Sequence, residues 1–495
     1  MGSVSVSSAI EIERKYAVPD GTALPPLHGV AGVVRVEAHP VALLEAVYLD
    51  TAERTLLAAG IVLRRRTGGH DAGWHIKLRG PVGRTELHAP IDEQQPDRVP
   101  DEFEAALRTR LRGRPIAPIA RIRTERTAVV VTDDAGGAVE VVDDVVSATD
   151  VEAGVLRTWR EWEAEQADDC PVCRALLDRV HEVLLGAGAA PSESPAKIAQ
   201  ALGLVGAERP AERPETAGAV LTARLAEHAE QLHRGVQTLV LDGDAAGAAV
   251  HALRKTIRRA RSLLALEPAA GPAGAALRDR LGGIGRMLGE ARDPLVAAEV
   301  AGRLLDELPE GTPGVDAARE LLVDEPVRLL ASRTAALAAR LVEDDVLAAL
   351  AELEAFAPDG AQADAPRAAL GGLVEGELRR ARRRGRRSLG RDVDALHGAR
   401  KAAKRARFVI EELIAAKALP AKSKHRQAAR RAEQAADVFG DHRDLALVLD
   451  ALPEASERLT AAGGNAYALG LAAERGRAHL AALRRATERA VQRLL

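Results

Sequence analysis

Aromatic residues are scarce in this chain. Trp, Tyr and Phe together make up 2% of its 495 residues. Proteins that bind single-stranded nucleic acid usually stack the bases on aromatic rings, and few rings are available here. Hydrophobic residues nevertheless make up 47% of the chain. The composition is therefore that of a globular protein whose helices are built largely from Ala and Leu.

Long apolar runs are also missing. No stretch of about 18 uncharged apolar residues occurs, which is the length that a membrane-spanning helix needs. Residues 1–10 contain no basic region followed by an apolar segment, so they do not resemble a secretory signal. We therefore expect a cytoplasmic protein without a membrane partner.

Cysteine is nearly absent. The two cysteines form one C-P-V-C unit, Cys170 and Cys173. A structural zinc site needs four ligands, and a disulfide scaffold needs several bridges. A redox pair at a helix terminus is an alternative, but no thioredoxin-like βαβ pattern surrounds the unit. We interpret the pair as two ordinary thiols at the start of a helix.

The chain is too long for one core, since domains average roughly 150 residues. Its first part, residues 1–204, contains short alternating segments separated by Gly, Pro and Asp, a pattern typical of strands. We expect an antiparallel barrel with flanking helices at 101–111, 170–186 and 195–202. The strand segments are residues 10–16, 61–66, 73–79, 85–91, 119–131, 138–142 and 158–165.

The apolar period changes to 3.6 in residues 219–495, after a linker at 205–218 that is rich in Pro and charge. Two motifs recur in this all-α part. V-H-A-L-R-K-T-I-R-R-A-R at 250–261 returns as L-H-G-A-R-K-A-A-K-R-A-R, 146 residues later. L-G-E-A-R-D at 288–293 returns as F-G-D-H-R-D, 151 residues later. Two such matches predict a duplicated four-helix bundle.

Charge is unevenly distributed along the chain. The formal net charge is -3, yet residues 379–430 contain 18 Lys and Arg against 4 Asp and Glu. A segment of this kind is suited to an anionic partner.

The first strand places two carboxylates and an ammonium on one face, because Glu11, Glu13 and Lys15 alternate. Similar alternation recurs in most of the other strands. These charges could all lie on solvated outer faces, which is the common arrangement. However, carboxylates gather on the first and last strands while bases occupy the strands between them. This division predicts a charged barrel interior, in which Arg and Lys neutralise phosphate oxygens and carboxylates hold Mg²⁺ or Mn²⁺.

E-I-E-R-K at 11–15 resembles the ExExK signature of the CYTH family, also called triphosphate tunnel metalloenzymes. Seven further motifs follow in that family's order, and the resemblance covers nearly all of residues 9–203. They are Y-L-D-T at 48–51, L-R-R-R at 63–66, H-I-K-L-R at 75–79, R-T-E at 84–86, V-D-D at 142–144, E-W-E-A-E at 161–165 and S-P-A-K-I at 194–198.

The resemblance implies an eight-stranded antiparallel tunnel that acts on tripolyphosphate, thiamine triphosphate, RNA 5′-triphosphate ends or ATP. It implies catalytic roles for Glu11, Glu13, Lys15 and Lys77. The implied metal ligands are Glu11, Glu13, Asp143, Glu161, Glu163 and Glu165, and the implied substrate-binding residues are Arg64, Arg66, Arg84, Arg123, Arg126 and Lys197.

Arg123 and Arg126 cannot both face inward on a regular strand, because their separation is odd. Either a bulge separates them or one assignment is wrong, and we favour Arg126. The expected mechanism is electrostatic clamping with a metal-positioned water and no covalent intermediate. No Walker loop and no adenine-binding element is visible in the sequence, so inorganic triphosphate ranks above nucleotide and thiamine substrates.

The repeated helical motif produces a basic stripe at i, i+3, i+4 and i+7. The alternative to a binding surface is an ordinary solvated helix face, whose charges are paired with acids such as Asp293 and Asp444. The pattern resembles the CHAD domain, which implies polyphosphate binding and association with polyphosphate granules. Nucleic acid is the competing polyanion, but the scarcity of rings favours polyphosphate. The stripe residues are His251, Arg254, Lys255 and Arg258 in the first copy and His397, Arg400, Lys401 and Lys404 in the second.

Three hypotheses follow. The first is a metal-dependent inorganic triphosphatase that its CHAD domain docks on polyphosphate. The second is a scaffold without catalysis, in which both domains only bind polyanions. The third is a CYTH enzyme acting on thiamine triphosphate or, as an adenylyl cyclase, on ATP.

Overall fold

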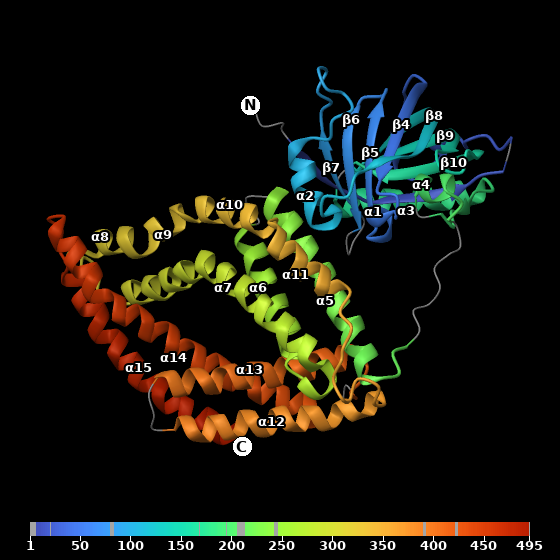
Figure 1. Cartoon of the computed structure of the whole chain (residues 1–495). Helices are drawn as coiled ribbons and strands as arrows, with labels where there is room; N and C mark the ends of the chain where they lie inside the picture. The colour runs from blue at the N-terminus through green and yellow to red at the C-terminus, as the bar shows by residue number, and fades with distance from the viewer. Residues whose placement is uncertain are drawn as a thin grey trace. The chain divides into compact units, whose positions relative to one another are not determined.

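The computed structural model describes residues 6–19, 21–79, 84–167, 169–194, 196–204, 213–241, 246–389, 393–420 and 424–494. The chain divides into two compact units, Met1–Ala211 and Glu212–Leu495. The first unit is built on a curled sheet and the second consists of helices (Figure 1). No helix in the described ranges is both long and apolar enough to cross a membrane.

The sheet of the first unit closes through its N-terminal segment. β1 (Ser7–Glu11) pairs with β7, while β2 (Glu13–Ala17), which follows after one residue, pairs with β10. The strand order is β1-β7-β6-β5-β4-β8-β9-β10-β2-β11, with β3 paired to β8 and all pairs antiparallel. Since β1 and β2 are one segment, it and seven further described strands form the ring expected from the sequence. The other strands are β3 (Val33–Ala38), β4 (Ala42–Asp50), β5 (Ile61–Thr67), β6 (Gly73–Arg79), β7 (Arg84–Ala89), β8 (Ala117–Asp133), β9 (Ala138–Asp150), β10 (Leu156–Gln166) and β11 (Ala190–Pro191).

Helices flank the barrel. α2 (Asp101–Leu111) begins with acidic residues and ends with basic ones, as the helix dipole favours. α3 (Pro171–Gly186) covers β9 and β10 from outside, and its Leu176, Leu177 and Val180 share a core with Trp162. Packing of this kind commits alternate residues of β9 and β10 to the outer face. Their other residues must therefore point into the barrel. The remaining helices of this unit are α1 (Thr55–Ala58) and α4 (Lys197–Ala201).

The two cysteines form a disulfide at the start of α3. Cys170 precedes the helix and its sulfur accepts a hydrogen bond from the Cys173 amide at 3.0 Å. The interpretation as two thiols was therefore wrong. Only Pro171 and Val172 separate the two cysteines, and the turn of the chain at the start of the helix brings their sulfurs together.

The second unit is all-α, as predicted. α5 begins at Ala217, inside the predicted linker, because the Ala217 amide already donates to the Ala365 carbonyl. Residues 205–212 of that linker lie outside the described ranges. The principal helices are α5 (Ala217–Leu241), α6 (Ala246–Leu264), α7 (Glu267–Asp306), α10 (Leu330–Leu341), α11 (Asp344–Glu354), α12 (Leu370–Ser388), α13 (Val393–Ala415), α14 (Lys424–Ala461) and α15 (Tyr467–Leu494).

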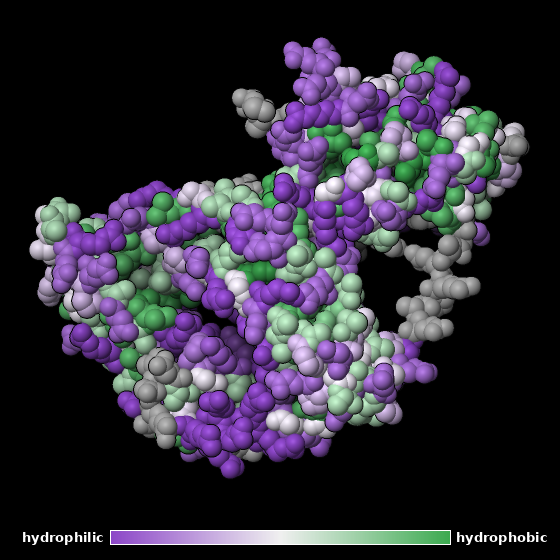
Figure 2. Space-filling view, in the orientation of Figure 1, coloured by the Kyte–Doolittle hydropathy of each residue, from purple (hydrophilic) through white to green (hydrophobic). Residues whose placement is uncertain are grey.

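The repeat in sequence is a repeat in structure. α5, α6 and α7 pack in succession, and so do α12, α13 and α14, while α6 and α13 meet between the two sets. One large core joins both sets, with Leu253 and Ile257 on α6 and Val409 and Ile410 on α13. Figure 2 shows the visible face of this unit hollowed between α7 and α13, with hydrophilic residues around the hollow. The duplicated motif thus places its two basic helices in contact.

Candidate functional site

A cavity of about 380 Å³ lies inside the barrel. Its wall carries charged side chains from nearly every strand, since inward positions alternate along each strand. The predicted residues that line it are Glu11, Glu13, Lys15, Arg64, Arg66, Lys77, Arg126, Glu163, Glu165 and Lys197. The charged-interior arrangement expected from alternation is therefore the one the structure shows.

Strand β8 points Arg126 into the cavity and Arg123 out of it. Its register against β4 and β9 runs without a shift from residue 120 to 126. No bulge therefore changes the side on which Arg123 emerges. The Arg123 side chain is 64% exposed and its nearest acid is Glu45 on the outer face. The prediction that Arg123 binds substrate was wrong in placement, whereas the preference for Arg126 agrees with the structure.

Strand β9 presents Asp144, not Asp143, to the interior. Asp144 lies opposite Glu161, while Asp143 lies opposite Trp162, which packs against α3. Asp144 is fully buried and accepts two hydrogen bonds from Arg126, at 2.7 and 2.8 Å. Asp143 instead pairs with Arg160 on the outer side. The prediction that Asp143 is a metal ligand was therefore wrong. The residue that lies beside Glu161 and Glu163 is its neighbour Asp144.

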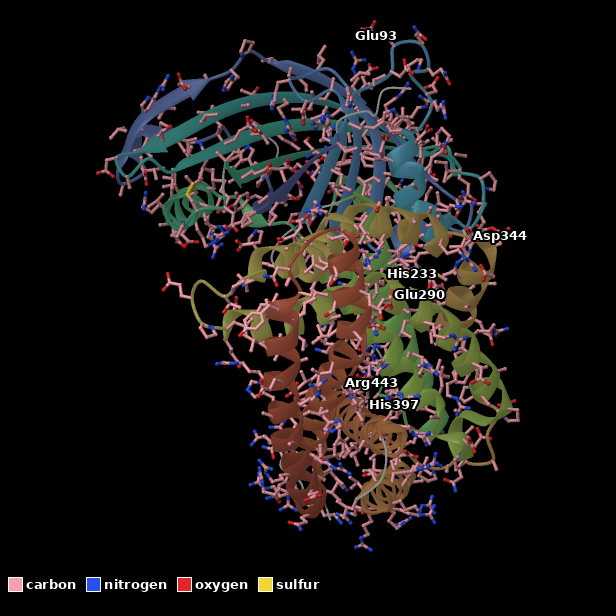
Figure 3. All side chains as sticks on the ribbon, turned by 90° about the vertical axis from the view of Figure 1, so that its left-hand side faces the viewer. Glu93, His233, Glu290, Asp344, His397 and Arg443 are labelled. Carbon is pink, nitrogen blue, oxygen red and sulfur yellow. A yellow bond between two sulfur atoms is a disulfide. The ribbon has the colours of Figure 1, made fainter. Side chains whose placement is uncertain are left out.

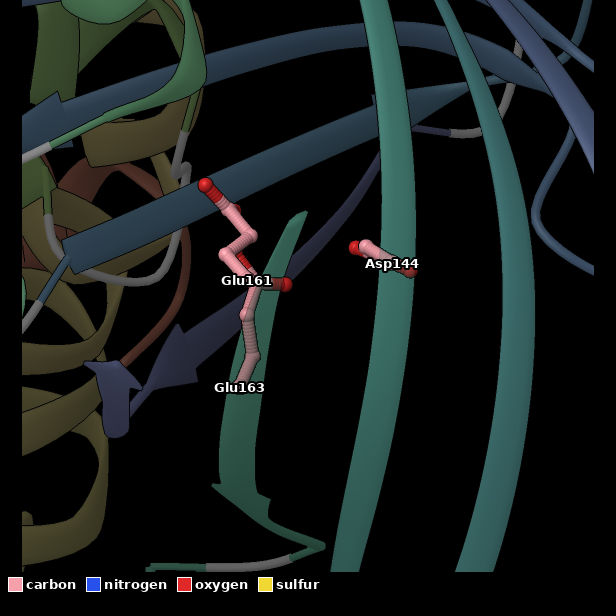
Figure 4. A group of neighbouring side chains, drawn as sticks. All are labelled: Asp144, Glu161 and Glu163. Carbon is pink, nitrogen blue, oxygen red and sulfur yellow. The ribbon is translucent and has the colours of Figure 1, made fainter. Parts of the chain in front are cut away.

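Asp144, Glu161 and Glu163 form a buried carboxylate cluster on two adjacent strands (Figure 4). Each offers an oxygen, and these oxygens all lie within 4.8 Å of one another. The ammonium of Lys197 contacts all three carboxylates, at 2.6–2.9 Å. Burial alone would lower the pKa of Lys197, but the carboxylates outweigh burial and raise it. The three carboxylates thus bind the ammonium of Lys197, and hard oxygen donors of this kind could also bind a metal ion.

A second group joins the N-terminal strand to β6 and β7. Lys77 Nζ donates to both oxygens of Glu11, at 2.6 and 2.8 Å. Burial and a hydrogen bond with Glu86 raise the pKa of Glu11 to about 8. The pKa of Glu86 is lowered far below its ordinary value although burial opposes this, because His75 and Glu11 hydrogen-bond to it. Of these two neighbouring carboxyl groups, Glu11 is therefore the one that holds a proton more readily.

The remaining bases have acidic partners as well. Lys15 contacts Glu13 and Glu163, and Arg64 donates to Glu86 at 3.2 Å. Arg66 pairs with Asp71, and burial and the nearby guanidinium of Arg64 lower its pKa to about 9.

Two further predicted residues complete the set. Burial raises the pKa of Glu165 to about 7. The backbone of Arg84 lies on β7 opposite Glu11, but its side chain is outside the described part of the structure.

The helical unit uses its two repeated motifs together. Arg254 on α6 donates to Asp293 on α7 at 2.7 Å, and its guanidinium lies against Gly289. Arg400 on α13 lies in the same way against Gly440 on α14, where a Cβ would come within 3.1 Å of it. The glycine of the second motif thus makes room for the arginine of the first. This contact explains why the two motifs are duplicated together.

The basic stripes of α6 and α13 converge. Burial, Arg254 and Arg400 lower the pKa of Arg258 to about 10. Burial, Arg400 and Arg258 lower the pKa of Lys404 to about 8. Each helix therefore carries cations that repel those of the other. We call Arg254, Arg258, Arg400 and Lys404 the central basic cluster.

The other stripe residues surround this cluster. Lys255 and Lys401 are exposed, and burial and four nearby cations lower the pKa of His251. His397 lies on α13 beside α14, which carries Arg443 (Figure 3). Arg254 pairs with Asp293, so acids neutralise part of the stripe, as expected for a solvated helix face. Arg258 and Lys404, in contrast, repel each other.

Comparison with known proteins identifies both units. The CYTH domain profile matches residues 9–167 and the CHAD domain profile matches residues 223–453. Two uncharacterised proteins of Mycobacterium tuberculosis, from strains CDC 1551 / Oshkosh and H37Rv, are 33% identical to the chain. Each alignment covers 98% of this chain and 97% of the relative. The chain belongs to the CYTH–CHAD family.

Solved structures resemble one or the other domain. The crystal structure of the CHAD domain from the plant Ricinus communis covers 58% of this chain and 95% of its own, with 22% identity and a TM-score of 0.44. PptA from Streptomyces chartreusis covers 56% of this chain and 99% of its own, with 20% identity and a TM-score of 0.45. HpAC1 from Hippeastrum covers 39% of this chain and 96% of its own, with 16% identity and a TM-score of 0.25.

Sequence reasoning missed several residues of the CYTH cavity. Besides Asp144, they are Tyr48, Glu86 and Glu140, which line the wall, and His75, which lies behind it. Glu86 has a signal in the sequence, because it alternates with Arg84 in the R-T-E motif. Glu140 and Asp144 lie four residues apart on β9, so their side chains leave the same face of the strand. A correct choice of Asp144 over Asp143 would therefore also have placed Glu140 inside the barrel.

Proposed function

We propose that the CYTH domain hydrolyses inorganic triphosphate with a divalent metal ion, and that the CHAD domain binds polyphosphate. The observation that carries the first part is the barrel cavity, which six bases line together with Glu163, one member of the Asp144–Glu161–Glu163 cluster. CYTH domains act on triphosphates, as triphosphatases or adenylyl cyclases. Among the described lining residues Tyr48 is the one aromatic side chain. An inorganic substrate therefore fits this wall better than a nucleotide or a thiamine compound.

The ion pairs of the cavity support a metal requirement. A triphosphate that took Lys15, Arg126 or Lys197 as partners would separate these bases from Glu163 and Asp144. Buried carboxylates left without a partner cost about 3–5 kcal/mol each. A divalent cation that enters with the anion would restore their neutrality. The preferred ligand is therefore a metal–triphosphate complex and not the free anion.

Asp144, Glu161 and Glu163 would hold this ion, which supplies charge neutralisation and a polarised water when bound. The protein's own groups do the rest. Arg64, Arg126 and Lys15 neutralise the phosphate oxygens and fix the chain in line for attack. Glu11, whose carboxyl pKa is raised, lies on the same wall, where it can pass a proton to or from the reacting oxygens.

The activity is tested by phosphate release from tripolyphosphate, thiamine triphosphate and ATP, each with Mg²⁺, with Mn²⁺ and with chelator. We expect turnover of tripolyphosphate that requires metal and exceeds turnover of the other two substrates. Formation of cyclic AMP would instead identify an adenylyl cyclase. Absence of turnover with every substrate and metal would contradict catalysis and support the polyanion-binding scaffold.

The central basic cluster supports the CHAD part of the proposal. Arg258 is exposed and Lys404 is half-buried. The two cations repel each other in the free protein, and an anion that neutralises them removes this cost. Polyphosphate supplies closely spaced negative charges without bases that need stacking. Nucleic acid fits less well, because Phe408 and Phe439 are buried in the core and offer no exposed ring.

Polyphosphate binding should weaken as pH rises from about 7 to about 9, because Lys404 loses its proton near pH 8 in the free protein. A bound polyanion favours the ammonium and raises its pKa toward the ordinary 10.5. Binding then takes up one proton, and the affinity falls by up to about tenfold per pH unit above 8.

The variant Lys404→Arg is the matched control, since its guanidinium stays charged over this range. Its affinity, measured by calorimetry in two buffers of different ionisation enthalpy, should change little with pH. Equal slopes for the wild type and the variant would show that Lys404 does not contact the anion.

A further inference from the structure

Helix α12 carries a basic surface outside the central basic cluster. Seven of the nine residues from 379 to 387 are arginine. Residues Ala381, Gly385 and Ser388 face the core, so the opposite side of the helix is left to arginine. The exposed arginines are Arg379, Arg380, Arg383, Arg384, Arg386 and Arg387, and we call them the α12 surface. Figure 2 shows hydrophilic residues gathered along this helix.

Carboxylates do not neutralise this surface. Within the described ranges, none of its six arginines forms an ion pair with an acid. Like charges at i, i+3 and i+4 destabilise a helix by about 0.2–0.5 kcal/mol per pair. Arg379, Arg383, Arg386 and Arg387 contain several such pairs. By contrast, Arg405 and Arg407 on the neighbouring α13 each have a glutamate partner.

The α12 surface is continuous with basic residues on both sides. Arg384 reaches α13 beside Gly398, next to the stripe residue His397. On the other side of α12, Arg382 shares a groove of about 270 Å³ with Lys424 and Arg431 at the start of α14, where Glu375 pairs with Lys424 and leaves the groove with a net positive charge. The positive surface therefore begins at the α13 stripe and extends across α12 to α14.

We propose that the α12 surface is a second polyphosphate-binding surface, which continues the path from the central basic cluster and gives the CHAD domain a preference for long chains. This inference rests on the proposed polyphosphate binding by that domain. A short chain occupies the central basic cluster alone. A long chain extends over α12, where each additional phosphate–arginine contact releases a counterion and adds affinity.

The chemistry of the surface favours polyphosphate over other polyanions. The described exposed face of α12 between residues 379 and 388 offers arginine and no aromatic ring or large apolar side chain. Single-stranded nucleic acid would lack a stacking partner there. A membrane-surface helix would need apolar residues beside its basic ones. The α12 surface can therefore bind a partner through charge alone, which suits a chain that consists only of phosphate.

The test is a full-length variant in which Arg379, Arg383, Arg386 and Arg387 are changed to Gln. Affinity is measured for pentapolyphosphate and for polyphosphate of about 100 units, over a series of salt concentrations. We expect the long chain to bind about 10- to 100-fold more weakly to the variant, with a shallower salt dependence, since each lost contact reduces the slope by about 0.7 for a single-stranded polyanion. The affinity for pentapolyphosphate should stay within about twofold, because the central basic cluster is unchanged.

A matched control removes four arginines from α10 and α15, which also tests the effect of net charge. It should bind both chains nearly as the wild type does. The control positions are Arg333, Arg340, Arg475 and Arg477.

Equal weakening of both chain lengths, or no weakening of either, would overturn the second surface. Loss of binding to RNA or to phosphatidylserine vesicles without loss of long-chain binding would assign the surface to that partner instead. If the wild type binds neither chain, the proposed function of the CHAD domain fails, and this outcome is distinct from failure of the α12 surface.

Discussion

We expect Asp144→Asn to lower the turnover of tripolyphosphate by about 10²- to 10³-fold and Asp143→Asn to leave it nearly unchanged. The two carboxylates are adjacent in sequence but face opposite sides of β9. Asp144 lies in the cluster with Glu161 and Glu163, and its loss weakens the hold on a metal ion and frees Arg126. Removal of one such preorganised charge typically costs about 10²- to 10³-fold in kcat. Asp143 pairs with Arg160 on the outer side of the barrel, so its replacement acts on the stability of the fold and leaves the cavity wall in place.

The measurement compares kcat and KM of both variants at several Mn²⁺ concentrations, together with Mn²⁺ affinity from calorimetry and thermal unfolding of each protein. Asp144→Asn should lower both kcat and Mn²⁺ affinity without preventing folding. If Asp143→Asn is the inactive variant, the register of β9 is different from the one described. If both variants retain wild-type activity, the carboxylate cluster is not the metal site.

We expect the double variant Arg258→Glu, Lys404→Glu to lose polyphosphate binding. Charge-assisted hydrogen bonds contribute about 1.5–3 kcal/mol each, so reversal of two cations lowers the affinity by at least about 100-fold at low salt. The same change relieves repulsion in the free protein, because burial and neighbouring cations lower the pKa of both residues. The variant should therefore unfold at the same temperature as the wild type or at a higher one.

A residue that merely supported the fold would behave differently, since its replacement would lower stability together with affinity. The matched control reverses Arg333 and Arg477, which have the same charge and lie on α10 and α15. It should bind polyphosphate within about threefold of the wild type, because neither residue belongs to the central basic cluster and salt screens exposed charges. Unaltered binding by the double variant would exclude the central basic cluster as the polyphosphate site.

Local patterns along the chain were enough to predict two domains, their fold classes and most of the cavity wall. Alternation on a strand has a period of two, so Glu11, Glu13 and Lys15 had to share a face wherever the strand lay. The 3.6-residue period did the same for the stripe on α6 and its copy on α13. The ends of α2 were readable as well, because Asp101 starts the helix and basic residues close it.

Only the tertiary structure decided which face of each strand is the inner one. Side chains alternate along a strand, so either the odd-numbered or the even-numbered residues can face inward, and the sequence does not say which. Asp143 and Asp144 were therefore equally good candidates. The apolar face of α3 makes the choice, since it buries Trp162, and Asp143 lies opposite Trp162 on the same outer side. The same reason separates Arg126 from Arg123. Contact between α6 and α13 likewise brings together two stripes that are 146 residues apart, because helix packing, not local periodicity, sets which faces meet.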